Sequence, residues 1–87
     1  MIEQKTVTTD WSLVSSSTTV SFQVTNLQTS GAKVIFAAAD SAPAAGTAIG
    51  FHYCVGQSEI NEPLTAFGAG PNLYARTTAG VAAVTVA

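Results

Sequence analysis

Apolar and polar residues alternate most clearly between Thr19 and Thr25. Val20, Phe22 and Val24 fall on one face of an extended chain, and Ser, Gln and Thr residues fall on the other. Strict alternation of this kind predicts a half-buried β-strand with a wettable outer face.

The segment 33–39 is apolar on both faces, which predicts a strand that is central or covered on both sides. Residues 26–32, which contain Asn, Ser and Gly, predict a turn. We therefore expect 19–25 and 33–39 to pair as an antiparallel hairpin. A second hairpin is expected near the C-terminus, where Thr78-Ala79-Gly80 joins alternating runs at 73–77 and 81–86.

Further short segments fit the same interpretation. Residues 51–55 predict a strand bounded by glycines, and 6–9 with 11–14 predict one bent strand or two short ones. Residues 40–47 predict a loop, as do residues 59–63, which precede a possible short strand at 64–67. Helical patterning is nearly absent, because the alanine-rich stretch 37–48 is interrupted by Pro and Gly.

These elements predict an all-β fold, a small antiparallel β-sandwich or barrel of about six to eight short strands. We expect one domain, with residues 18–87 forming the sandwich and residues 1–17 forming an N-terminal arm or edge strands. A chain of 87 residues and 8.8 kDa has room for no second domain.

Composition excludes several functions. Lys5, Lys33 and Arg76 are the only cationic residues, too few and too scattered to bind a nucleic acid backbone. The longest strongly apolar run, 34–39, is far shorter than a membrane-spanning helix. Cys54 is the only cysteine, so no internal disulfide forms. No apolar stretch of signal-peptide length follows the N-terminus, and we expect folding in a reducing cytoplasm or stabilisation by partners.

Charge is scarce on this chain. Only 9% of its residues are charged, whereas roughly 25% is usual, so the outward positions must be mainly Thr, Ser, Gln, Asn, Ala and Gly. Such a surface is wettable but repels its own copies weakly. We expect much of it to contact other protein; the alternative is a Thr-rich secreted monomer.

Candidate chemistry is limited to two pairs of residues. His52 and Cys54 share one face of a predicted strand, as a nucleophile and its base would, but no third group or further metal ligand accompanies them. Glu59 and Glu62 lie in a predicted exposed loop, where a carboxyl group is a poor general acid. We predict no catalytic residues, no metal, no cofactor and no enzymatic activity.

The aromatic residues allow two interpretations. Trp11, Phe51, Tyr53 and Tyr74 suit a sugar-stacking platform, but core packing or anchoring at an interface is favoured. Tyr74 and Arg76 share a strand face, and both types are enriched at interface hot spots. We therefore select Trp11, Tyr74 and Arg76 as interface candidates; a cross-strand ion pair is the alternative for Arg76.

A resemblance accompanies these features. Its residues are Ala42-Pro43-Ala44-Ala45, the stretch reaching Gly50-Phe51, Gly68-Ala69-Gly70-Pro71-Asn72-Leu73-Tyr74-Ala75-Arg76 and Gly80-Val81-Ala82-Ala83-Val84-Thr85-Val86. Together with residues 18–39, they resemble small virion structural proteins of tailed bacteriophages. The likeness covers residues 18–87 and is a pattern of turns and strands built from small residues.

This resemblance implies a β-sandwich module on a phage particle. The expected function is that of a capsid decoration or cement protein, which stabilises the head through subunit contacts. The alternatives are a component of the tail, tail fibre or head–tail connector, and a carbohydrate-binding module. The implied partners are the major capsid protein or another virion protein and further copies of the chain, with a trimer favoured. The expected location is the virion, after synthesis in the host cytoplasm.

Overall fold

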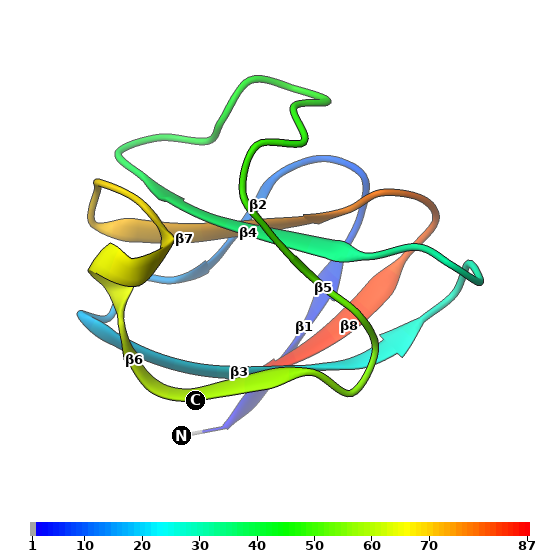
Figure 1. Cartoon of the computed structure of the whole chain (residues 1–87), viewed down its shortest axis with the longest axis horizontal. Helices are drawn as coiled ribbons and strands as arrows, with labels where there is room; N and C mark the ends of the chain where they lie inside the picture. The colour runs from blue at the N-terminus through cyan, green and yellow to red at the C-terminus, as the bar shows by residue number, and fades with distance from the viewer. Residues whose placement is uncertain (1) are drawn as a thin grey trace.

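A computed structural model describes residues 2–87 and contains eight strands and one short 3₁₀ helix. These are β1 (Glu3–Val7), β2 (Ser12–Ser15), β3 (Thr19–Leu27), β4 (Val34–Ala39), β5 (Phe51–Tyr53), β6 (Ser58–Pro63), η1 (Leu64–Phe67), β7 (Asn72–Thr77) and β8 (Ala82–Val86). Two four-stranded antiparallel sheets pack face to face, as Figure 1 shows. The predicted all-β class is confirmed.

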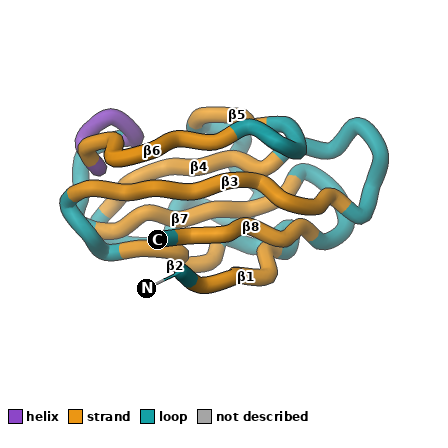
Figure 2. Tube along the Cα trace, turned by 90° about the horizontal axis from the view of Figure 1, so that it is seen from below, coloured by secondary structure: helices purple, strands orange, loops and turns teal. Residues whose placement is uncertain are grey.

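The strands pair from the ends of the chain inward. Sheet A has the order β1-β8-β3-β6, and sheet B has the order β2-β7-β4-β5. The first strand pairs with the last, the second with the seventh, the third with the sixth and the fourth with the fifth. The two layers of this arrangement are visible in Figure 2. A double ribbon of eight strands wrapped into two sheets is the jelly-roll architecture.

Both predicted hairpins are wrong. β3 belongs to sheet A and β4 to sheet B, and β7 and β8 are divided between the sheets in the same way. Both connections therefore cross from one layer to the other. Alternation of apolar residues shows which face of a strand is buried, and that face is the same whether the next strand lies beside it or opposite it.

The region after β5 also differs from the prediction. β5 ends at Tyr53 rather than at residue 55, residues 58–63 form β6 instead of a loop, and residues 64–67 form η1 instead of a strand. β6 is polar because it is an edge strand whose side chains are exposed or only partly buried. Its sequence therefore lacks the apolar alternation that marked β3.

The core lies between the facing sheets. Val20, Phe22 and Val24 of β3 are buried as predicted, and they meet Val34 and Phe36 of β4. The Phe22 and Phe36 rings stack with centroids 4.0 Å apart. Each fully buried side chain of this size contributes roughly 1.5–3 kcal/mol to folding.

β4 is covered on both sides, as its sequence predicted. Ile35 points to the outer face of sheet B yet is fully buried. The loop that follows β4 runs above this strand in Figure 1, and Gly50 at its end lies against Ile35 and Phe36. A Cβ on Gly50 would lie 2.7 Å from Ile35 Cγ2 and 2.8 Å from the Phe36 carbonyl oxygen. Only glycine allows so close an approach at a φ of +153°.

The predicted N-terminal arm or edge segment lies at the side of the sandwich. Within residues 2–17, β1 forms one edge of sheet A and β2 forms one edge of sheet B. Figure 2 shows both strands along the same side of the molecule. Met1 lies outside the described residues.

Candidate interaction surface

Arg76 lies on the outer face of sheet B, where it is directly opposite Ile35 in the strand register. Its guanidinium is buried and donates from Nε to the Thr9 carbonyl oxygen at 2.8 Å and from Nη1 to the Thr47 carbonyl oxygen at 3.0 Å. Thr9 belongs to the connection between β1 and β2, and Thr47 to the connection between β4 and β5. Arg76 therefore holds two loops of its own chain over sheet B, and it forms this contact rather than the cross-strand ion pair considered from the sequence.

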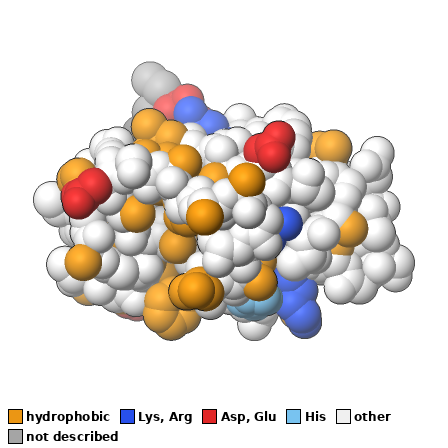
Figure 3. Space-filling model, turned by 90° about the horizontal axis from the view of Figure 1, so that it is seen from above, with side chains coloured by type: hydrophobic (Ala, Val, Ile, Leu, Met, Phe, Trp, Pro, Cys, Tyr) orange, Lys and Arg blue, Asp and Glu red, His pale blue; other side chains and the backbone are white. Residues whose placement is uncertain are grey.

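Tyr74 lies on the same outer face and is partly buried. In the register it lies between Leu13 of β2 and Ala37 of β4. Leu13 is 51% exposed, so this corner of sheet B carries a small apolar surface. Figure 3 shows that apolar side chains are spread across this side of the molecule, with separate acidic and basic side chains around them.

Trp11 immediately precedes β2 and is partly buried. Its indole Nε1 is buried and has no hydrogen-bond partner among the described residues. A buried donor without an acceptor costs free energy in the isolated chain. Of the three interface candidates, Tyr74 lies directly opposite the strongly exposed Leu13 in the strand register.

The outer face of sheet A has a different composition. Opposite residues of paired strands share a face, so Gln4, Thr85 and Gln23 line one row across β1, β8 and β3. Thr6 and Ala83 form the next row. These outward positions are small or uncharged.

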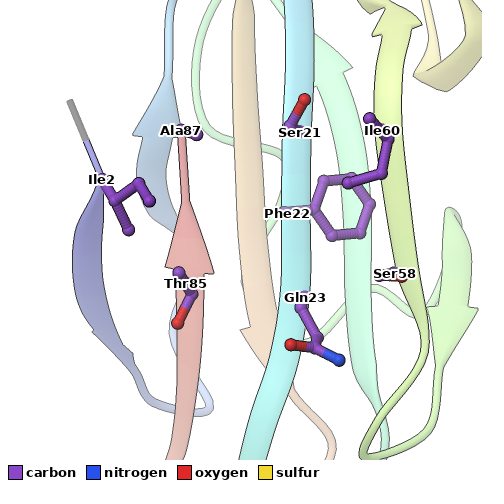
Figure 4. Close-up of a pocket in the computed structure, with 8 residues that line it drawn as sticks. All are labelled: Ile2, Ser21, Phe22, Gln23, Ser58, Ile60, Thr85 and Ala87. Atoms are coloured by element: carbon purple, nitrogen blue, oxygen red, sulfur yellow. The ribbon is translucent and has the colours of Figure 1, made fainter.

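A shallow apolar groove of about 250 Å³ crosses this face. Figure 4 shows its lining residues, which are Ile2, Ser21, Phe22, Gln23, Ser58, Ile60, Thr85 and Ala87. Ile60 is 67% exposed and Ile2 is 74% exposed, one at each edge of the sheet. Alternation in residues 19–25 predicted that Ser21 and Gln23 face outward, whereas neither Ile2 nor Ile60 lies in a clear apolar pattern that would have indicated it.

The charged side chains of sheet A occupy other positions. Glu3 and Lys5 are directly opposite the core residues Val86 and Val84, and their charged groups lie 3.4 Å apart. The edge strand β1 therefore carries its charges on the side of the sheet that faces sheet B. None of the eight groove residues is charged.

The carboxylates of β6 also lie on the side of sheet A that faces sheet B. Glu59 and Glu62 are opposite Phe22 and Val20, which are core residues. Glu59 accepts a hydrogen bond from the Tyr53 hydroxyl at 2.9 Å, which ties the edge of sheet B to the edge of sheet A. Glu59 is thus a partly buried bridging residue of a strand, whereas the sequence predicted a solvated loop charge.

The surroundings of Tyr53 change the pKa of its phenol. Burial of Tyr53 raises the pKa of its phenol well above the usual value. The hydrogen bond to Glu59 and the negative charges of Glu59 and Glu62 raise it further. The phenol therefore keeps its proton at neutral pH and acts as the donor in its hydrogen bond to Glu59.

The two residues considered for nucleophilic chemistry do not form a pair. His52 lies on β5, and its Nε2 is 3.0 Å from the Ala48 carbonyl oxygen. Cys54 follows the end of the strand, is exposed, and lies 3.5 Å from Lys33 Nζ. Among residues 2–87, no three His, Cys, Asp or Glu side chains lie close enough together to hold a metal ion.

The aromatic platform is also divided. Phe51 and Tyr53 are opposite Phe36 and Val34 and so face the core side of sheet B. Tyr74 lies on the outer face of the same sheet. Side chains on opposite faces of a sheet cannot stack together on one sugar.

No family model, curated protein or solved structure matches this chain. Within the part of the chain that the structure describes, no helix is long and apolar enough to cross a membrane.

Proposed function

We propose that this protein is a non-enzymatic structural subunit of a virus particle, of the capsid decoration type. In this function it stabilises the head by packing the outer face of sheet A against a shell protein. The resemblance of residues 18–87 to small virion proteins of tailed phages and the jelly-roll topology, which is common in viral capsid proteins and lectins, support the proposal. The fold alone does not imply the function.

One observation carries the proposal: the outer face of sheet A is uncharged and grooved. Its groove residues include two exposed isoleucines and otherwise small or uncharged side chains, while the charges of β1 and β6 lie on the other side of the sheet. Covering such a face with protein avoids the large free-energy cost of burying charged groups. On a symmetric shell, many copies multiply a modest contact energy.

The alternative functions from the sequence differ in what supports them. A component of the tail or of the head–tail connector would use the same uncharged face, so the position of the chain in the particle separates it from a decoration protein. A carbohydrate-binding module lacks support, because the candidate aromatic residues lie on different faces.

The test compares two exposed isoleucines. Ile60 lies in the groove of sheet A, and Ile49 lies in the loop beside sheet B with 82% of its surface exposed. We expect Ile60→Glu to remove the chain from purified particles and Ile49→Glu to leave its copy number unchanged. Quantitative mass spectrometry of the particles measures both, and circular dichroism of the isolated chains checks folding.

Two results would contradict the proposal. One is a wild-type chain that is absent from assembled particles. The other is a chain whose copy number on particles is the same in both glutamate variants. Density for the chain on the tail rather than the head would replace decoration with the tail function.

A further inference from the structure

Four edge strands leave backbone groups unpaired in this sandwich, and three of them carry features that hinder pairing with another chain. β5 has only three residues, and β2 has four with a register shift. β6 contains a register shift, Asn61 at a φ of +53° and Pro63 at its end. Short, bulged, proline-containing or charged edges are the usual protection against edge-to-edge association.

β1 is neither short nor bulged and contains no proline, so its only protection of this kind is the pair of charges on Glu3 and Lys5. It pairs with β8 in an unbroken register from Glu3 to Val7, and these five residues make no other backbone hydrogen bond to residues 2–87. Every second N–H and C=O group along its free side is therefore open to a further strand. Figure 2 shows β1 at the margin of sheet A, with no strand of that sheet beyond it.

The charges on β1 select the strand that fits. Glu3 and Lys5 share one face, separated by Gln4. When a second β1 runs antiparallel to the first with the two Gln4 residues opposite each other, Glu3 of each copy faces Lys5 of the other. Opposite charges directly across two strands stabilise the pair.

Neighbouring registers fail on the same rule. Centring the pair on Lys5 places the two lysines opposite each other, and centring it on Glu3 opposes the two glutamates. Like charges in that position destabilise strand pairing. The edge is thus complementary to itself in one symmetric register near its middle.

We infer that β1 is a homodimer interface, in which two copies pair edge to edge about a two-fold axis through Gln4. The two A sheets then form one continuous eight-stranded sheet, and their uncharged outer faces become contiguous. A symmetric pair uses the same surface on both subunits. This inference does not rest on the proposed function. It predicts a two-fold pair, whereas the resemblance to virion proteins implies a trimer.

A five-residue edge buries far less than the roughly 1,600 Å² of a standard interface, so the dimer is concentration-dependent. Sedimentation equilibrium of the full chain measures it. We expect the variants K5E and E3K each to weaken dimerisation about tenfold, because each places two like-charged pairs across the interface. The exchange variant E3K/K5E restores both opposite pairs and, with them, the wild-type dissociation constant.

A mixture provides the sharpest control. In the proposed register, E3K contributes two lysines and K5E contributes two glutamates, so all cross-strand pairs become complementary. We expect the two variants to form a heterodimer when mixed, although each is mainly monomeric alone. Circular dichroism of each variant confirms that the sandwich is folded.

The inference is overturned by a wild-type chain that remains monomeric at millimolar concentration or forms a trimer. It is equally overturned by a dimer that K5E and E3K leave intact, or by an exchange variant that fails to regain dimerisation.

Discussion

The outer faces of the two sheets are used in opposite ways. Sheet B is partly covered by its own chain, because Arg76 holds two loops over it and Ile35 is fully buried beneath them. In Figure 2 no loop of the described residues crosses the outer face of sheet A, which has uncharged residues around an open groove. The outer face of sheet B is therefore partly buried within the folded chain, whereas the outer face of sheet A stays accessible. A partner can reach sheet A because no loop is held over it.

The largest test of this difference compares outer-face residues of the two sheets. We expect Ile35→Ala to lower the free energy of unfolding by about 2–4 kcal/mol, because it leaves a cavity in a fully buried site. Thr85→Ala, on the outer face of sheet A, should change it by less than about 0.5 kcal/mol. Urea unfolding measures both. Equal losses would show that sheet A is covered as well.

Removing the guanidinium tests whether Arg76 holds the two loops over sheet B. Arg76→Ala leaves the Thr9 and Thr47 carbonyl groups without their donor, so we expect a loss of about 2–3 kcal/mol. Hydrogen exchange and limited proteolysis should show both loops opening, while the strands of sheet A stay protected. Unchanged exchange in these loops would mean that Arg76 does not hold them.

Close approach of the loop to β4 is tested by two glycines. Gly50→Ala drives a Cβ into Ile35 and the Phe36 backbone, and we expect a loss of about 1–3 kcal/mol. Gly46 also has a positive φ, but nothing lies within 4 Å of its added Cβ. Gly46→Ala should therefore cost only about 1 kcal/mol, through backbone strain alone. A similar cost at both positions would argue against the close contact with sheet B.

The smallest expected effect concerns the hydrogen bond between Tyr53 and Glu59, which links the edges of the two sheets. Because the pKa of Tyr53 is raised in the folded chain, the unfolded chain loses the phenolic proton first as pH rises. The stability contributed by the neutral phenol is thus complete below the unfolded pKa of about 10 and declines above it. We expect Tyr53→Phe to lose about 1 kcal/mol at neutral pH and to flatten the decline above pH 10. Thermal unfolding from neutral to alkaline pH measures it. An unchanged alkaline slope would contradict the prediction.

The sequence patterns predicted which face of a strand is buried better than they predicted which strands pair. The alternation in β3 identified Val20, Phe22 and Val24 as buried, and the apolar run in β4 indicated cover on both sides. The hairpin predictions failed because a short connection with glycine serves equally well within one sheet or between two. Edge strand β6 was missed because partial exposure permits a polar sequence.

The contacts of the candidate interface residues were harder to predict from the sequence, because they depend on tertiary structure. Arg76 was selected as an interface residue from its type and its neighbour on the strand, but its partners are backbone carbonyls of Thr9 and Thr47. Main-chain groups leave no mark in a sequence, so nothing there indicated that these loops would converge. The opposite charges of Glu3 and Lys5, two residues apart on a strand, were a signal that the sequence did contain.

The position of β8 has a consequence for biosynthesis. This strand lies between β1 and β3 in sheet A, yet it follows all other strands along the chain. During translation, β1 and β3 must therefore wait with incomplete hydrogen bonding until the ribosome has made β8. Pairing between segments so far apart in sequence is slow. The nascent protein is consequently most vulnerable to aggregation before that last strand arrives.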